Sequence, residues 1–419
     1  MVLASVTSTD SRVATARVLR RLTFGPFPEQ LDELAGLDPS ALVVELLDRP
    51  DLGAPAEHPG AGTEEEWDAP VRWWLARMAD PAAGLHERMV WFWHGHLTSS
   101  IEKVEGWGPM WDQHLLLREH AFGNLRELLQ AITVDRAMLW YLDGEGSHGD
   151  EPNENYSREL MELFALGRGN YTEDDVRAGA KALSGWYVEW TEDGPGEAVF
   201  DPEGHWGRSV PFLGRRVLDA ADVVDAVCDQ PAIGPHIATA LHTELIGRPP
   251  SPERATELGR LFVETGLEIR PLVEAIVSSP DLLDPDAGRF RTGVEWLVAA
   301  FGVLGADEEL GRGAAEHLNQ IPFAPPNVAG WPHGPSWAAP SQQLARLTML
   351  SWVDGAPELG DGDPGEAVEV VLGRCGLVEV SDDTRAALLN AAAAYPDDPE
   401  ARSHLLHVLA LASPEFGRT

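Results

Sequence analysis

The sequence has few cysteines: Cys228 and Cys375 are the only two among 419 residues, and no pairing motif surrounds them. This scarcity excludes a disulfide-rich scaffold and a zinc site built from thiolates. Long hydrophobic runs are also missing, since the uncharged stretch 296–306 is too short to span a membrane. The first ten residues show no basic segment followed by an apolar core, so no signal peptide is seen and a soluble, cytoplasmic protein is expected.

Positive charge is scarce as well. The 31 lysines and arginines are outnumbered by 68 aspartates and glutamates, which gives a formal net charge of −37. Such a surface repels phosphate backbones and anionic membranes, so we expect no nucleic-acid partner. The sequence also lacks a Gly-Lys-Ser/Thr phosphate loop, a Gly-x-Ser-x-Gly nucleophile turn and a His-Glu-x-x-His zinc helix. These absences remove the enzyme classes that are simplest to recognise and leave metal-assisted chemistry open.

What the sequence does contain is mainly helical periodicity, with 44% hydrophobic residues to build a large core. We predict a mainly α protein whose large multi-helix domain covers residues 1–354. Alternating residues in 186–190 and 198–200 flank a turn rich in glycine and predict a small β-hairpin insertion near 186–216. Residues 355–419 are predicted to form an acidic linker and a C-terminal helical region that packs on the main domain.

The segment from Asn153 to Gly167 is the most informative one. It predicts an amphipathic helix, with Asn153 as the N-cap and Gly167 as the C-terminal stop. Spacings of four and three residues place three polar side chains on one face of this helix: Asn155, Glu159 and Glu162. Two carboxylates on one face favour the binding of a cation or a proton. In the alternative interpretation the face is merely solvated, and Glu162 pairs with Arg158.

A second group of polar residues lies upstream, in a helical pattern that ends at two histidines. Glu87, Trp91 and His94 share one helical stripe, so an acid and an imidazole lie among bulky aromatic residues. Imidazole nitrogen and carboxylate oxygen together suit zinc, iron or manganese. His96 points away from His94 on a helix, so the two need not share a role. The alternative is that His94 is a buried packing residue whose imidazole is bonded to the backbone.

Two loops carry further candidates. Residues 200–207 are rich in glycine and proline and contain His205, a third candidate metal ligand. Residues 325–337 form a longer loop of the same kind, in which Trp331 and His333 are predicted to line a pocket. A rigid structural crossover is the alternative interpretation of this second loop.

Tryptophan is unusually frequent in residues 67–141, which contain eight of them. Aromatic surfaces of this kind stack against sugar rings or other flat ligands. Packing between helices is the alternative interpretation of the same residues. Arg346, on the helix that follows the second loop, is expected to reach back to a carboxylate.

Together these segments resemble the DUF1800 family. The matching motifs occur in the expected order: Arg20–Pro26, Phe92–His96, Asn153–Gly167, Asn170–Val176 and Pro326–Trp331. The resemblance implies a mainly helical bacterial protein, often exported and often encoded beside a DUF1501 protein, but it implies no activity. It also implies polar family positions at His94, His96, Asn153, Asn155, Tyr156, Arg158, Glu159, Glu162 and His205. This chain departs from the family pattern at Phe164, where many members have histidine, and at Trp206, where many have aspartate.

The leading hypothesis from the sequence is a metal-dependent enzyme, either a hydrolase or an iron-dependent oxidoreductase. The predicted ligands of a zinc, iron or manganese ion are His94, His96, Glu159, Glu162 and His205. The predicted catalytic residues are Glu87, Arg158 and Glu162. The predicted substrate-binding residues are Trp91, Asn155, Tyr156, Trp331, His333 and Arg346.

The alternative hypothesis is a non-catalytic binding or assembly protein. Its tryptophan-rich groove would hold a small molecule, a glycan or a protein partner such as a DUF1501-like protein. The two hypotheses differ in geometry. Catalysis predicts that Glu159, Glu162 and a histidine converge within reach of one metal, whereas the binding protein predicts arginines between those carboxylates.

Overall fold

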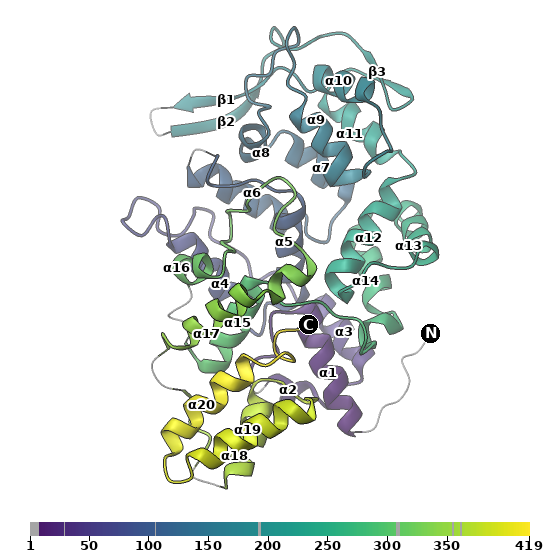
Figure 1. The fold of residues 1–419 in the computed structure, drawn as a ribbon. Helices are drawn as coiled ribbons and strands as arrows, with labels where there is room; N and C mark the ends of the chain where they lie inside the picture. Colours follow the sequence, from purple (N-terminus) through teal and green to yellow (C-terminus); the bar gives the residue numbers. More distant parts are fainter. Residues whose placement is uncertain are drawn as a thin grey trace.

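The computed structural model describes residues 8–28, 30–104, 106–191, 194–306, 311–353, 356–360 and 363–419. The chain is mainly α-helical, as predicted, with two small antiparallel hairpins (Figure 1). The first helices are α1 (Ser8–Leu22), α2 (Gln30–Leu34), α3 (Pro39–Asp48), α4 (Ala69–Ala79), α5 (Gly84–His96), α6 (Trp107–Glu119), α7 (Leu125–Thr133), α8 (Arg136–Tyr141), α9 (Asn155–Glu159), the π-helix η1 (Leu160–Ala165) and α10 (Glu173–Ala182).

The second half of the chain is helical again after the hairpins. Its elements are α11 (Ala220–Cys228), α12 (Ile233–Ile246), α13 (Pro252–Glu264), α14 (Ile269–Val277), the 3-10 helix η2 (Pro280–Leu283), α15 (Gly293–Leu304), α16 (Arg312–His317), the 3-10 helix η4 (Gly334–Ala338), α17 (Pro340–Leu350), α18 (Pro364–Arg374), α19 (Asp382–Ala394) and α20 (Pro399–Leu411). Side-chain caps fix several of their first turns. In α15 a capping box joins Thr292 and Glu295, which satisfies backbone N–H groups that the helix itself leaves free.

The predicted hairpin insertion is present. Strands β1 (Trp186–Thr191) and β2 (Gly194–Phe200) pair antiparallel, with Trp186 opposite Phe200 and a bulge between Val188 and Trp190. A second, shorter hairpin follows, formed by β3 (Val210–Phe212) and β4 (Arg215–Val217). Figure 1 shows both hairpins at the end of the molecule that also carries α7 to α11.

The segment Asn153–Gly167 is helical but not the single α-helix that was predicted. The helix begins at Asn155, after Asn153 accepts a hydrogen bond from the backbone N–H of Asn155. From Leu160 the α-helix gives way to the π-helix η1, whose wider turns change the directions of the side chains that follow. Gly167, with φ of 80°, lies just beyond the end of η1, where it was expected to stop the helix.

The tryptophans of residues 67–141 mostly form core. Trp74, Trp93, Trp107 and Trp111 are fully buried, whereas Trp67 is 58% exposed. Rings of α4, α5 and α6 pack edge to face, as in the pair Trp74 and Trp91, with centroids 5.5 Å apart. Packing between helices therefore explains most of this cluster, and it holds α5 in the middle of the molecule (Figure 1).

The C-terminal helices α18 to α20 lie at the opposite end from the hairpins (Figure 1). Contacts with the rest of the chain include the Trp296 indole N–H, which donates to the Leu411 carbonyl at 3.0 Å, and an ion pair between Arg17 and Glu379 at 2.6 Å. The predicted domain boundary between residues 354 and 355 lies outside the described residues. Over the described ranges, no helix combines the length and the apolar character that crossing a membrane requires.

Candidate functional site

Of the two carboxylates in the Asn155–Ala165 segment, Glu162 is held by local partners. Glu162 accepts a hydrogen bond from the Tyr171 hydroxyl at 2.5 Å and pairs with Arg168 at 2.6 Å. These two bonds, the tyrosine first, lower the pKa of Glu162. Burial, followed by the nearby Glu162 charge, raises the pKa of Glu159. Arg158 does not pair with Glu162 as the alternative interpretation expected, because Glu154 at 3.2 Å and Glu173 at 2.7 Å hold its guanidinium.

Glu87 belongs to a buried ion pair. Its carboxylate accepts the indole N–H of Trp74 at 2.5 Å and both terminal nitrogens of Arg118 at 2.9 and 3.0 Å. A bidentate pair of this kind holds the two side chains in one geometry. The sequence assigned Glu87 to orienting an imidazole or to catalysis, and in the structure its hydrogen bonds join α4, α5 and α6.

His94 is a buried structural histidine. Its Nε2 accepts the backbone N–H of Phe323 at 3.0 Å, and its ring packs against Trp74 with centroids 5.0 Å apart. Burial lowers the pKa of His94 to about 3, so the ring is neutral at ordinary pH. His94 thus fixes the start of the loop around residue 323. Its Nε2 atom, which accepts this hydrogen bond, is not available to a metal ion.

His205 lies in the segment between β2 and β3. One ring nitrogen lies 2.9 Å from the Ser184 carbonyl and the other 3.1 Å from the Leu218 carbonyl. Both nitrogens therefore face backbone oxygens. This arrangement ties residues 205 and 218 to the end of α10 and leaves His205 with a structural position.

The predicted metal ligands do not converge. Within the described ranges, no three or more side chains of histidine, cysteine, aspartate or glutamate are arranged to hold a metal ion. The expected set was His94, His96, Glu159, Glu162 and His205. Part of the physical reason is visible in their partners, since backbone groups contact ring nitrogens of the three histidines, and Arg168 and Tyr171 bind Glu162.

Three predicted substrate-binding residues also have structural contacts. The Tyr156 hydroxyl lies 2.8 Å from the Thr133 hydroxyl, and the Asn155 amide donates to Asp143 at 2.8 Å. Arg346 donates to the Arg291 carbonyl at 2.8 Å, and within the described ranges it forms no hydrogen bond with a carboxylate. None of these three lines the pocket described next.

A pocket of about 550 Å³ lies between α5, α12, the segment 289–292 and the loop 320–337. It contains four residues that the sequence singled out: Trp91, His96, Trp331 and His333. Polar groups at the pocket come from Thr243, Glu244, Arg289, Thr292 and Gln320. Sequence patterns had indicated the pocket residues of α5 and the 325–337 loop, and had not indicated those polar residues.

Aromatic rings form the first wall. Trp91 and Trp331 stack with centroids 5.0 Å apart and an interplanar angle of 17°. Phe92 stacks on His96 in the same way, at 5.3 Å and 16°. Trp337, from η4, also lines the pocket, and its indole N–H donates to the Pro332 carbonyl at 2.7 Å. The loop that supplies Trp331 and Trp337 is therefore an ordered element of the pocket.

Two features hold this loop against α5. The Thr98 hydroxyl donates to the Val328 carbonyl, and the backbone N–H of Ile101 donates to the Phe323 carbonyl at 2.8 Å. Gly330 has φ of 78°, and a Cβ placed on it would lie 2.5 Å from the Gly95 carbonyl oxygen. Only glycine allows this close approach together with a left-handed backbone.

His96 and His236 support the π-helix from two sides. Nε2 of His96 lies 2.9 Å from the Phe164 carbonyl, and Nε2 of His236 lies 2.9 Å from the Leu163 carbonyl. Burial first, and then the neighbouring His236, lower the pKa of His96 to about 4. Because a carbonyl only accepts, Nε2 of the neutral His96 ring carries the proton. Two imidazoles therefore bind consecutive carbonyls that the π-helix presents to them.

The stability of the protein is expected to fall in mild acid because of His96. Its pKa is about 4 in the folded chain and near its ordinary 6.5 when unfolded, so the unfolded chain binds the extra proton between these values. Stability is then lost as pH falls through this window. Replacing His96 with glutamine, which can still donate to Phe164, should flatten the curve by up to about 1.4 kcal/mol per pH unit. Urea unfolding of both proteins across the window measures this, and parallel curves would contradict it.

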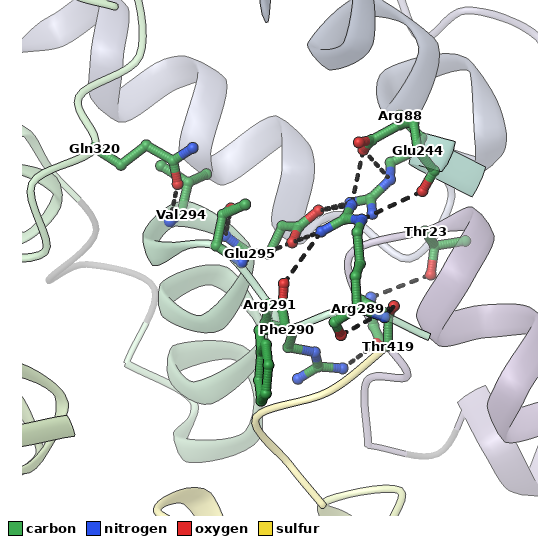
Figure 2. A network of polar contacts seen from close by, with 12 residues as sticks. Thr23, Arg88, Glu244, Arg289, Phe290, Arg291, Val294, Glu295, Gln320 and Thr419 are labelled. Atoms are coloured by element: carbon green, nitrogen blue, oxygen red, sulfur yellow. Dashed lines mark hydrogen bonds and ion pairs between the residues drawn. The ribbon is translucent and has the colours of Figure 1, made fainter. Parts of the chain in front are cut away.

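The polar wall contains a buried network of ion pairs (Figure 2). Arg289 reaches Glu244 at 2.8 Å and Glu295 at 2.5 Å, and Arg88 reaches Glu295 at 2.5 Å. Glu295 also accepts the Thr292 backbone N–H at 2.8 Å, as part of its capping box. Its two arginines lower the pKa of Glu295 despite burial. The Thr-x-x-Glu spacing was the one sequence signal that pointed to this region, and it predicts only the helix start.

A family model described as a protein of unknown function (DUF1800) matches residues 17–418. Neither a curated protein nor a solved structure matches the chain.

Proposed function

The chain belongs to the DUF1800 family, whose function is unknown, and from its pocket we propose that it binds a small polar molecule with a ring, such as a sugar. One observation carries this proposal: indole rings and a carboxylate–guanidinium pair line the same cavity of about 550 Å³. Pockets for small ligands are typically about 300–1,000 Å³, with mostly apolar walls and a few placed polar groups.

The aromatic wall matches the apolar face of a sugar ring. An indole offers a flat apolar surface, while hydroxyl groups at the rim of the sugar need polar partners. Glu244, Thr292 and Gln320 provide such partners in the same lining. This arrangement favours the binding hypothesis over a metal-dependent hydrolase or oxidoreductase, whose predicted ligands are spread over separate elements.

Trp331 is expected to carry much of the binding energy. Replacing Trp331 with alanine removes a ring that lines the pocket and stacks on Trp91, so affinity should fall about tenfold or more. Isothermal titration with a panel of mono- and disaccharides measures the change, and circular dichroism checks that the variant is folded. Trp190→Ala is the matched control, because this indole is 58% exposed on the β1–β2 hairpin and outside the pocket. No saccharide binding by the unmodified protein, or equal affinities in both variants, would overturn the proposal.

A further inference from the structure

The arginine at the pocket has no donor left for a ligand. Arg289 carries five N–H groups, as every guanidinium does. Two approach Glu295 oxygens at 2.5 and 2.6 Å, and one approaches the Glu244 carboxylate at 2.8 Å. The remaining contacts are with the backbone carbonyls of Glu244 at 3.3 Å and Phe290 at 3.4 Å. A ligand carboxylate or phosphate would therefore have to displace the protein's own carboxylates from Arg289.

The carboxylate at the pocket is only half used. Oε1 of Glu244 accepts from Arg289 at 2.8 Å and lies 3.4 Å from Nε of Arg88. Oε2 of Glu244 has no hydrogen-bond partner within the described part of the chain, and the side chain is 14% exposed where it lines the pocket. A carboxylate oxygen accepts hydrogen bonds and cannot donate them. The strongest unoccupied polar atom here therefore requires a donor from the ligand.

His96 also requires a hydrogen-bond donor from the ligand. Its Nε2 proton is used by the Phe164 carbonyl, so the Nδ1 atom of the neutral ring is an acceptor. The aromatic wall adds a third preference, because the faces of indole rings attract cations. Oε2 of Glu244 and the π faces of the tryptophans thus offer this pocket two features that suit a positively charged donor.

We propose that the ligand of this pocket is a cyclic amine of the amino-sugar class, with its ammonium group against Glu244 and its ring against the tryptophans. This inference rests on the proposed function and specifies its ligand. An ammonium group supplies up to three donors and a positive charge, and charge-assisted hydrogen bonds are the stronger kind. A neutral sugar would satisfy the same acceptors with weaker bonds.

Two further arginines add positive charge near the pocket, which opposes the binding of an ammonium group. Arg291 and Arg346 are both 98% buried, and among the described residues neither forms an ion pair with a carboxylate. Their guanidinium groups donate to the Gly25 carbonyl at 2.7 Å and the Arg291 carbonyl at 2.8 Å, and neither residue lines the pocket. Arg88 and Arg289 are balanced by Glu244 and Glu295. Glu244 and Arg289 both line the pocket, and of the two only Glu244 keeps an unoccupied oxygen among the described residues.

Three sugars with one ring and different charges test this proposal on the unmodified protein. D-glucosamine, D-glucose and D-glucuronate are titrated calorimetrically at slightly acidic pH, where the amine is protonated. D-glucosamine should bind about tenfold more tightly than D-glucose, and D-glucuronate more weakly than both. Equal binding of the first two, or tightest binding of D-glucuronate, overturns the amine preference and leaves the proposed function standing. No binding of any of the three overturns both.

A substitution at Glu244 tests whether this carboxylate causes the preference for the amino sugar. In Glu244→Gln the side chain keeps its size and loses its charge, so D-glucosamine and D-glucose should bind with similar affinity. Glu264→Gln is the matched control, because Glu264 forms an exposed pair with Arg260 on α13. A Glu244→Gln protein that keeps the full preference overturns the assignment to this carboxylate. If that variant does not fold, the comparison of the three sugars decides alone.

Discussion

Replacing Glu295 with glutamine should cost about 3–5 kcal/mol of the free energy of unfolding. Glu295 is 2% exposed and is shared by Arg88 at 2.5 Å and Arg289 at 2.5 and 2.6 Å. Without its charge, two guanidinium groups would remain in the interior with only Glu244 to balance them. An unbalanced buried charge is far more costly than the pair was favourable, because no water solvates it.

Urea unfolding at neutral pH measures this loss. The control is Glu264→Gln, since the Glu264–Arg260 pair has side chains that are 58% and 64% exposed. Exposed pairs of this spacing contribute about 0.3–0.5 kcal/mol, so this variant should resemble the unmodified protein. If the two glutamine variants lose similar stability, the network at Glu295 is not the buried support of α15 that we describe.

The second large effect is expected at Gly330. In Gly330→Ala the new methyl group would lie 2.5 Å from the Gly95 carbonyl oxygen, on a backbone with φ of 78°. Two penalties then add: about 1–2 kcal/mol for a left-handed alanine and about 1–3 kcal/mol for the forced backbone shift. The shift would also move Trp331 away from α5, so the variant should lose affinity for the saccharides that the unmodified protein binds.

A substitution at Gly334, in the same loop, distinguishes the conformational penalty from the steric one. Its φ is 72°, but a Cβ placed there meets no atom within 4 Å. Gly334→Ala should therefore show only the conformational cost, and the stabilities of the two variants should differ by about 1–3 kcal/mol. Thermal or urea unfolding of both proteins measures the difference. Equal losses would show that the loop does not lie as closely against Gly95 as the structure places it.

Local sequence patterns predicted the elements well and their contacts poorly. Alternation in 186–190 and 198–200 predicted the β1–β2 hairpin because a period of two residues is a local property. The start and stop of the Asn153–Gly167 helix were nearly right, but its π-helical second half was not predicted. The π turn is held partly by His96 and His236, which come from α5 and α12, so no pattern within the segment reports it.

The candidate site likewise combines residues that local sequence patterns indicated with residues that they did not. Trp331 and His333 were predicted to line a pocket because loops rich in proline and glycine carry exposed functional side chains. Glu244 and Arg289 were not predicted, since nothing near either residue distinguishes it from an ordinary surface charge. They acquire their role only by meeting each other and Arg88 across three distant segments.

By itself, the sequence determined the family, the mainly helical class, the small hairpin and the aromatic wall supplied by α5 and the 325–337 loop. These depend on periodicity and on motifs that are contiguous in the chain. Only the tertiary structure decided which charges are paired, that His94 and Glu87 bond to other groups of the protein, and that Oε2 of Glu244 has no hydrogen-bond partner among the described residues. The physical reason is that the partner of a buried polar group is set by which distant segments pack beside it, and hydrogen bonding at that contact decides whether the group is occupied or available.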